Sequence, residues 1–515
     1  MKQGLRRAAS KIAGIIFSWA VLKFLLFTLT LIILLYAEED WRGARTWAAT
    51  KAKWETHGET FDLAKFIPPP IPDDQNLAAI PLFKMEPDPR YSDQTVLYPL
   101  TLLRAMYTEH GPEIQLPSKG NWMKGELPNL PKINQAIAEE YAELVKGTPP
   151  PDPLAQFNAI YPFLAELRDA SATRQQCRFD LNFATSPPAA RSMGLLTYQL
   201  RLSNLLTLHA ILALDHKQPD VALADITTSY TLLSGVKRDP SFVGALVAVG
   251  INAVCGAAIY DGLALHAWND TQLASLQRLL SQVDFLSVHQ FAMRSEIAED
   301  VLDIDYIKHR PHSEQYGYLF GQSDTPPAWF LDGVPQVWPR GWWDQNISRV
   351  VTMKFNYLTL VDPLARRVYP SAVSDLEKHI SKMSGRWDAG APWNLLAIIM
   401  STYLPSEPAK FAYGQTWIDE EQLAIALERY RLAQNAYPAT LDALVPAFIN
   451  ALPHDLIKGE PYHYRLNADG TFLLYSVGWN QKDDGGKAGL MAVNPKLLDQ
   501  TQGDWVWPTP QKSTP

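Results

Sequence analysis

The sequence predicts a mainly α-helical protein with an N-terminal transmembrane helix, a body of α-helical hairpins and a small α+β module at the C-terminus. Three observations lead to this fold class. An apolar run covers residues 12–37, apolar residues recur at three- and four-residue steps within residues 131–405, and residues 410–515 contain two strand-like runs joined by an Asp-Gly turn. A chain of 515 residues is long enough for about three domains.

The N-terminal run predicts a membrane anchor that spans once. Residues 12–37 supply the ~20 mostly apolar residues that a spanning helix needs, and Lys23 is the one charge among them. A charge at mid-bilayer costs ~3 kcal/mol, so we expect Lys23 to extend toward the membrane surface. The residues before the run are basic and those after it, residues 38–40, are acidic. The positive-inside rule therefore makes residues 1–11 a cytoplasmic tail and places the bulk of the chain outside the cytoplasm, in the periplasm.

A cleaved signal peptide is the alternative interpretation of this segment. Leu35-Tyr36-Ala37 precedes Glu38 and loosely resembles a processing site. The apolar run is longer than the ~7–15 residues that are typical of a signal peptide, which favours the uncleaved anchor.

Residues 38–130 are predicted to form a Pro-rich spacer and irregular region. It begins with Trp41, Trp47 and Trp54 among charged residues, as in an interfacial or early helical segment. Four prolines then fall within residues 67–74. Because proline fixes φ and has no N–H, this stretch should be extended polyproline chain.

Residues 131–405 are predicted to form an α-helical domain. Ser241 and Asn269 are expected to cap two of its helices, and an apolar run at residues 395–404 is expected to be a buried core helix. Short turns between the helices indicate hairpins packed side by side, although no strict 34-residue repeat is present. The expected helices cover residues 131–146, 195–214, 221–233, 242–265, 270–280 and 286–307.

Residues 410–515 are predicted to form a small α+β module. A helix at residues 418–435 leads to Tyr437-Pro438, and Asn467-Ala468-Asp469-Gly470 joins strands at residues 461–466 and 471–477. Asp-Gly between apolar alternations is a strong hairpin signal. The loop after the second strand contains Asp483-Asp484-Gly485-Gly486.

This order of motifs resembles the C-terminal half of the major pseudopilin of type II secretion systems. The whole chain is similar to uncharacterised membrane-anchored proteins of verrucomicrobial and planctomycete type. A pseudopilin carries its module directly behind a processed N-terminal helix, and that processing site is missing here. The resemblance therefore implies a borrowed module rather than polymerisation into a pseudopilus.

The resemblance also implies a calcium site in the loop after the second strand. Calcium prefers carboxylate and carbonyl oxygens in a flexible shell. The alternative is a plain polar turn built from residues that tolerate positive φ. The residues at the corresponding positions are Asn480, Asp483, Asp484 and Asp504.

No motif identifies a catalytic centre. The best acidic cluster is a helical stretch that either forms a solvated face or holds a metal or an acid–base pair. Aromatic residues that follow it would form a sugar-stacking or partner-binding platform, or pack in the core. The acidic stretch contains Glu296, Glu299, Asp300, Asp303 and Asp305 near His289, His309 and His312, and the aromatic set is Trp329, Phe330, Trp338, Trp342 and Trp343.

The composition narrows the functional class further. Lys and Arg total 46 and Asp and Glu total 54, a net charge of −8, which predicts no nucleic-acid partner. The 2 cysteines, Cys177 and Cys255, are too few for a disulfide-rich scaffold. They would either pair in an oxidising compartment or, as the apolar surroundings of Cys255 favour, stay buried.

These observations favour a non-enzymatic envelope scaffold or adaptor. Its partners would be the membrane and envelope proteins, and the resemblance extends these to secretion or pilus-type components. The first alternative is a cell-envelope hydrolase whose acidic cleft is formed by residues 296–305 and the tryptophan segment. The second is a structural protein whose C-terminal tail is stabilised by calcium.

Overall fold

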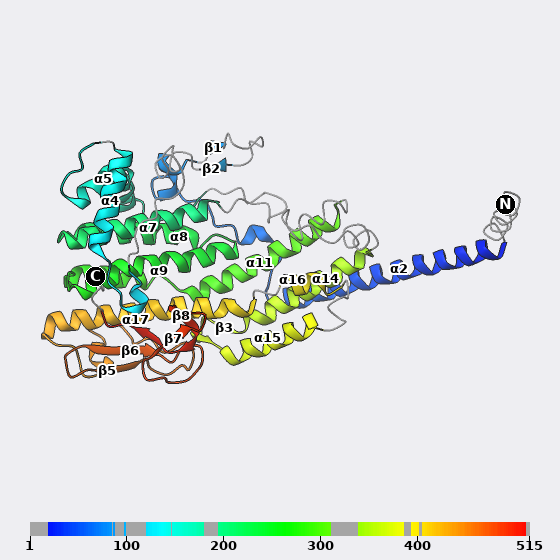
Figure 1. Ribbon diagram of the computed structural model, residues 1–515. Helices are drawn as coiled ribbons and strands as arrows, with labels where there is room; N and C mark the ends of the chain where they lie inside the picture. Colours follow the sequence, from blue (N-terminus) through cyan, green and yellow to red (C-terminus); the bar gives the residue numbers. More distant parts are fainter. Residues whose placement is uncertain are drawn as a thin grey trace, which may run out of the picture. The chain divides into compact units, whose positions relative to one another are not determined.

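Helix is the main secondary structure, as the sequence predicts. The structure is a computed structural model that describes residues 19–84, 86–87, 97–98, 120–145, 147–179, 194–310, 338–385, 393–400 and 404–510. The chain forms two compact units (Figure 1). Unit 1 comprises Met1–Phe61, Ile297–Phe355 and His379–Thr402, and unit 2 comprises Asp62–Glu296, Asn356–Lys378 and Tyr403–Pro515.

Helix α2 (Trp19–Thr56) in unit 1 combines two different halves in one continuous helix. Up to Ala37 its large apolar side chains are exposed, for example Phe24 at 66% and Leu34 at 59%. The ammonium of Lys23 lies over the ring of Trp19, one turn toward the N-terminus, 5.8 Å from the ring centroid. The tail at residues 1–11 and the start of the predicted anchor lie outside the described residues.

The second half of α2 packs against α14 (Arg340–Leu358) within unit 1. Glu39 is buried and its carboxylate accepts hydrogen bonds from the indole of Trp342 and the amide of Gln345, both at 3.0 Å. The two backbones approach closely, because a Cβ on Gly43 would lie 2.2 Å from the carbonyl oxygen of Gly341. Glycine at both positions is what allows the helices to meet.

Two described helices are long and apolar enough to cross a membrane, α2 and α9 (Phe242–Ala264). Helix α9 is largely buried in unit 2, where Ile251, Cys255 and Ile259 are almost fully inaccessible. We therefore assign α9 to the protein core, and α2 is the helix that leaves its apolar face uncovered.

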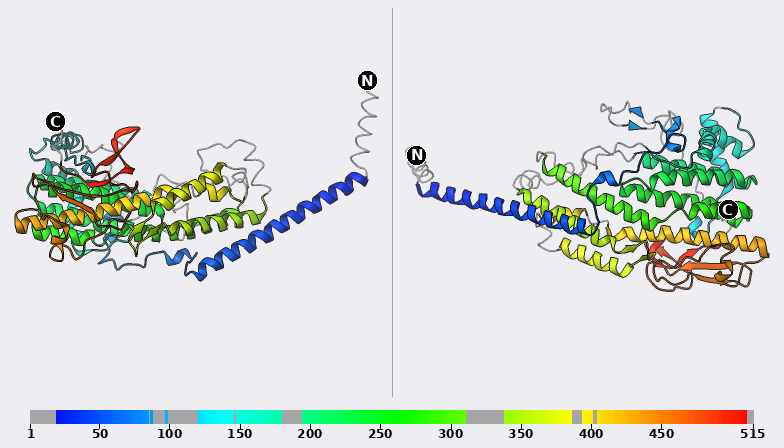
Figure 2. Two further views of the ribbon diagram at one scale, coloured as in Figure 1. Left: turned by 90° about the horizontal axis from the view of Figure 1, so that it is seen from below. Right: turned by 180° about the vertical axis from the view of Figure 1, so that it is seen from behind.

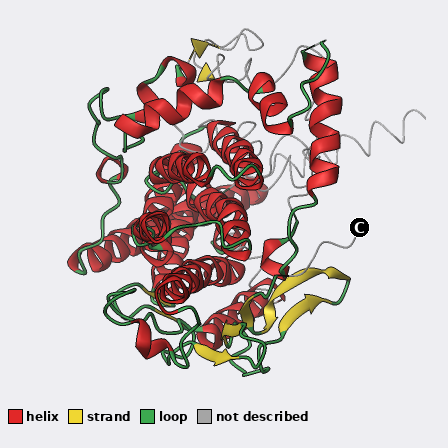
Figure 3. Ribbon diagram, turned by 90° about the vertical axis from the view of Figure 1, so that its left-hand side faces the viewer, coloured by secondary structure: helices red, strands yellow, loops and turns green. Residues whose placement is uncertain are grey.

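Unit 2 is built around α7 (Gly194–Asp215), α8 (Pro219–Val236) and α9, which lie side by side (Figures 1 and 3). Helices α4 (Leu130–Leu144), α5 (Pro153–Ile160) and α6 (Phe163–Thr173) join the core at α7 and α8. Ser241 caps α9 and Asn269 forms a capping box at α10 (Asp270–Leu280), as predicted. Helix α11 (Phe285–Lys308) is also confirmed.

Three segments differ from the sequence predictions. Residues 38–56 are helical, as the interpretation of an early helical segment has it, but they continue α2 without a break. Short 3-10 turns follow: η1 (Leu63–Lys65), η2 (Leu77–Ala79) and η3 (Pro81–Phe83). The apolar run at residues 395–404 forms only the five-residue α16 (Leu395–Ile399) and, beyond a gap in the described residues, η8 (Leu404–Ser406). The chain between α11 and α16 also forms α14, a short β3–β4 hairpin (Val361–Asp362 and Arg367–Val368) and α15 (Pro370–Gly385).

The third difference is helix α17 (Glu407–Gln434), which begins well before the predicted residue 418. It packs against α9 and α10 and also against the C-terminal strands. Trp417 on α17, Tyr260 on α9 and Leu474 and Trp507 on the sheet share one hydrophobic cluster. The first part of α17 is thus a core element of unit 2.

The C-terminal strands form two small antiparallel sheets at one side of α17 (Figure 3). The first has the order β5-β6-β9, from β5 (His463–Leu466), β6 (Phe472–Ser476) and β9 (Trp505–Trp507). The predicted hairpin is confirmed, with Leu466 opposite Phe472 across the Asp-Gly turn. The second sheet is a hairpin of β7 (Ala488–Met491) and β8 (Asn494–Gly503), whose tip stands out from the rest of unit 2 (Figure 2, left, red).

The close approach of α2 to α14 gives a first test. Gly43→Ala would place a methyl group against backbone atoms that cannot rotate away, so we expect it to destabilise unit 1 by about 1–3 kcal/mol. Denaturant unfolding of the full chain in detergent, followed by circular dichroism, measures the change.

The matched control is Gly250→Ala on α9. A Cβ there would meet only a leucine methyl at 3.6 Å, so this variant should unfold like the parent or slightly later. Equal unfolding curves for Gly43→Ala and the parent would show that the two helices do not cross at these glycines.

Candidate functional site

The predicted calcium loop is held together by its own hydrogen bonds. The carboxylate of Asp504 is buried and accepts backbone N–H groups from Asp484, Gly486 and Lys487 at 2.7–3.3 Å. Asn480 donates its amide to the Asp484 carboxylate at 2.8 Å. The structure therefore brings these three predicted residues together as a polar turn.

Asp483, the fourth predicted ligand, is engaged differently. Its carboxylate accepts the hydroxyl of Tyr475 at 3.0 Å and the backbone N–H of Gly485 at 2.9 Å, and these bonds lower the pKa of Asp483. Over the residues that the structure describes, no group of three or more His, Cys, Asp or Glu side chains is placed to hold a metal ion. Calcium binding at Asn480, Asp483, Asp484 and Asp504 stays a prediction of the resemblance.

The acidic stretch on α11 is buried only in part, and Asp305 near its end is exposed, as on a solvated face. Within unit 1, Glu299 and Asp300 are both buried. Asp300 pairs with the equally buried Lys354 of α14 at 2.6 Å, and Lys308 pairs with Asp344 at 2.7 Å. In each pair the ammonium neutralises the carboxylate, and the two ion pairs connect α11 to α14.

The predicted aromatic platform is divided in the structure. Trp329, Phe330 and His312 lie outside the described residues. Trp338 contacts the rings of Trp342 and Trp343, and Trp342 hydrogen-bonds Glu39 of α2. The described tryptophans therefore join two helices of unit 1.

His289 and the cysteines are core residues of unit 2. The ring of His289 lies among Phe242, Phe411 and Tyr357, and burial lowers its pKa to about 3, so the ring is neutral. Cys177 and Cys255 are both buried, and burial raises the pKa of Cys177 well above its ordinary value. Of the two interpretations of the cysteines, burial is therefore observed and a disulfide between Cys177 and Cys255 is not.

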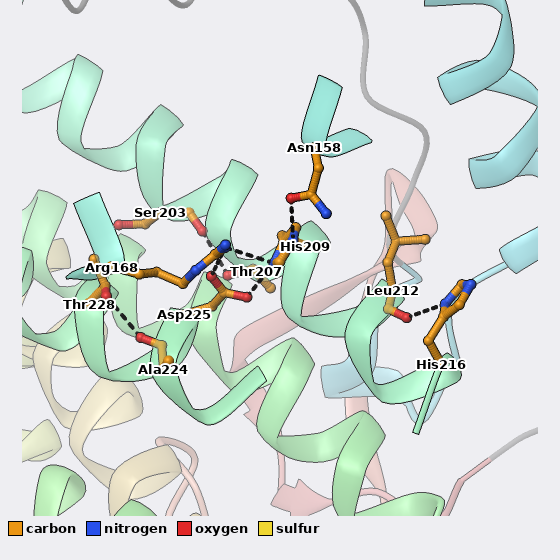
Figure 4. A network of polar contacts seen from close by, with 10 residues as sticks. All are labelled: Asn158, Arg168, Ser203, Thr207, His209, Leu212, His216, Ala224, Asp225 and Thr228. Atoms are coloured by element: carbon orange, nitrogen blue, oxygen red, sulfur yellow. Dashed lines mark hydrogen bonds and ion pairs between the residues drawn. The ribbon is translucent and has the colours of Figure 1, made fainter. Parts of the chain in front are cut away.

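A buried polar network centred on His209 escaped the sequence analysis (Figure 4). The Nδ1 of His209 on α7 lies 2.6 Å from Asp225 on α8, and Arg168 on α6 donates to the same carboxylate at 2.9 Å. The other ring nitrogen lies 3.0 Å from the side-chain oxygen of Asn158 on α5. The Asp225–His209 pair thus connects four helices. Because the four residues of the network are far apart in the sequence, no local sequence pattern could have predicted it.

Unit 2 also contains a cavity of about 320 Å³ that is lined by aromatic and charged residues and is partly open to solvent, which we call the aromatic pocket. It lies between the end of α9, helix α17, the β5–β6 turn and the chain that follows β9. Its lining includes Tyr260, Ala264, His266, Glu428, Arg431, Tyr437, Asp469, Phe472, Trp507 and Thr509.

Glu428 is the electrostatic centre of the aromatic pocket. Burial alone would raise its pKa, but hydrogen bonds from Arg431, His266 and Tyr437 outweigh burial and lower it. Arg431 binds both carboxylate oxygens at 2.7 and 2.8 Å, His266 Nδ1 lies at 2.8 Å and the Tyr437 hydroxyl donates at 2.9 Å. Glu428 is therefore ionised at neutral pH, and both of its carboxylate oxygens are engaged by these partners.

Seven residues earlier on α17, Glu421 is in the opposite situation. It is fully buried against Gly256 and Trp122, and among the described residues neither of its oxygens has a hydrogen-bond partner. Burial raises its pKa to about 8. Helix α17 thus carries two buried carboxyl groups in different states: Glu428 is held in the charged form and Glu421 in the neutral form.

Comparison of the chain with protein families, with curated proteins and with solved structures finds no match. Function therefore has to be argued from these sites alone.

Glu421 predicts an unusual dependence of stability on pH. Because its folded-state pKa lies above the ordinary value, the folded state binds the extra proton, and stability falls as pH rises from about 4.5 toward 8. Glu421→Gln should therefore raise the free energy of unfolding at pH 8 by about 1–3 kcal/mol and change it little at pH 5. Denaturant unfolding at the two pH values measures this difference.

Glu428→Gln is the matched control, with the opposite sign. The folded-state pKa of Glu428 is lowered, so its contribution is present above the ordinary value and is lost as pH falls through the folded pKa. The variant should lose about 1–3 kcal/mol at pH 7. If both variants shift stability in the same direction at pH 8, the assignment of neutral Glu421 is wrong.

Proposed function

We propose that this protein is a membrane-anchored, extracytoplasmic adaptor without enzymatic activity. The N-terminus would lie in the cytoplasm, and the chain that follows the anchor would lie outside it. The C-terminal module would contact envelope proteins, and the pseudopilin resemblance extends these partners to components of secretion or pilus-type machinery.

The observation that carries the proposal is the continuity of α2. Its exposed apolar half and its packed half form one helix, and Glu39 and Gly43 make contacts within unit 1 directly after the apolar run. Cleavage after Ala37 would cut this helix immediately before Glu38, which leaves a single residue ahead of the buried Glu39. An uncleaved anchor keeps the helix whole, which supports the anchor over the signal peptide.

The β7–β8 hairpin supports an adaptor role. Leu490, Val493 and Leu497 are 49%, 90% and 49% exposed, although each has a large apolar side chain. The hairpin contains the apolar segment Leu490-Met491-Ala492-Val493, which lies between Gly486 and Asp504 in the sequence. Exposed apolar side chains gathered on a projecting ribbon are typical of a protein-binding surface.

The hydrolase alternative gains no support from the described acidic residues. A catalytic carboxylate needs access to substrate, whereas Asp300 is buried and its ion-pair partner is the buried Lys354. The pairs on α11 support a structural role.

The anchor gives a direct prediction. Full-length protein from its own host should sediment with membranes, resist alkaline extraction and retain its N-terminal peptides, because no cleavage occurs after Ala37. Mass spectrometry of the purified chain checks this. A mature chain that begins at Glu38 and is released as soluble protein would reject the anchor.

The hairpin gives a prediction for partner binding. We expect the double variant Leu490→Ser and Val493→Ser to lose the proteins that co-purify with the full-length chain after in-cell crosslinking, with no change in fold. Deleting residues 410–515 is the weaker experiment, because it removes α17 from the core of unit 2.

Leu364→Ser is the matched control for this experiment, since Leu364 is a 99% exposed leucine on the β3–β4 turn of the same unit. The control should keep every partner. Partners retained by the double variant, or no partner for the parent chain, would reject the adaptor proposal.

A further inference from the structure

Tyr437 and Phe472 are the partly exposed rings of the aromatic pocket, whereas Tyr260 and Trp507 are almost fully buried behind them. The hydroxyl of Tyr437 already donates to Glu428, and that of Tyr260 donates to the carbonyl of Pro508 at 3.2 Å. Phe472 packs edge-on against Tyr437 with ring centroids 5.0 Å apart, which fixes both rings. A bound molecule would therefore meet preformed hydrocarbon and ring surfaces.

Three polar groups of the pocket remain for a ligand. Arg431 uses Nε and one Nη on Glu428 and keeps its other N–H donors. His266 uses Nδ1 on Glu428 and keeps its second ring nitrogen. Oδ1 of Asp469 accepts hydrogen bonds from the backbone N–H and the hydroxyl of Thr471, which leaves Oδ2 to accept from a ligand. The pocket therefore offers hydrogen-bond donors and an acceptor together.

The charges of these groups nearly cancel. Glu428 and Asp469 contribute −2 and Arg431 contributes +1, which leaves −1 with His266 neutral and 0 with His266 protonated. A pocket with this balance does not attract an anion. It matches a neutral molecule whose groups both donate and accept.

We propose that the aromatic pocket binds a neutral sugar ring. The C–H face of a pyranose packs on ring faces, and its hydroxyls accept from Arg431 and His266 while donating to Asp469. The volume of about 320 Å³ is at the lower end of the ~300–1,000 Å³ range of small-molecule sites and suits one or two sugar units. The inference concerns unit 2 alone and does not depend on how the chain is anchored.

The test uses the full chain in a detergent that contains no sugar. The probes are the methyl glycosides of β-D-glucose, β-D-galactose and N-acetyl-β-D-glucosamine, with saturation-transfer NMR to detect contact and titration calorimetry for Kd. We expect saturable binding of at least one glycoside. Ala264→Trp, which fills the pocket, should abolish it, and Asp469→Asn should weaken it about 3- to 10-fold.

Asp499→Asn provides a matched control. Asp499 makes the same pair of bonds to the backbone and hydroxyl of Thr501 that Asp469 makes to Thr471, but Asp499 does not line the pocket. This variant should bind the glycoside like the parent. The proposal is overturned if no glycoside binds, if Ala264→Trp binds equally well, or if tetramethylammonium or benzoate binds at the pocket in place of the sugars.

Discussion

Unit 2 depends on the burial of α17. Almost every side chain from Glu407 to Glu428 is buried, because the helix packs against α9 and α10 on some faces and against the C-terminal strands on another. A helix enclosed in this way has to accommodate its own charges. Asp419 does so through a two-bond pair with Arg366 at 2.7 and 2.8 Å, and Glu428 through Arg431, His266 and Tyr437.

These pairs also decide which segments stay together. Arg366 precedes β4 and Tyr437 follows α17, so each carboxylate fixes a loop at the edge of the hydrophobic core. A buried charge that loses its partner is strongly destabilising, whereas the intact pair adds little net stability. The polar contacts of α17 therefore specify the position of these loops more than they strengthen the fold.

Much of the fold followed from local sequence signals. Capping residues such as Ser241 and Asn269 and the Asp-Gly turn act within a few residues of themselves, so the helices of unit 2 and the β5–β6 hairpin were predicted close to their observed bounds. Helix α17 was predicted too short because it is buried on all sides, and a helix without a polar face gives no amphipathic signal. For residues 38–56 a helix was one interpretation, but its continuity with the apolar run was not predicted, because the polar half of α2 is stabilised by the distant α14.

The sites were less predictable than the fold. The aromatic pocket joins four segments, and Glu428, Asp469 and Trp507 become neighbours only after the sheet has packed on α17. The network of His209 likewise draws one residue from each of four helices. Among the ligands that the resemblance implies for the calcium loop, Asp504 lies beside Asp484, because the β7–β8 hairpin, which was not predicted, returns the chain to that loop.

The glycine crossing of α2 and α14 also constrains the order of events during synthesis. Asp40 and its partner Gly341 are separated by 301 residues, so the packed half of α2 has no partner until most of the chain has been made. At ~5–20 residues per second that interval is roughly 15–60 s. Unit 1 is consequently completed late, after much of the sequence of unit 2 has left the ribosome, and its apolar contacts stay available to chaperones throughout that time.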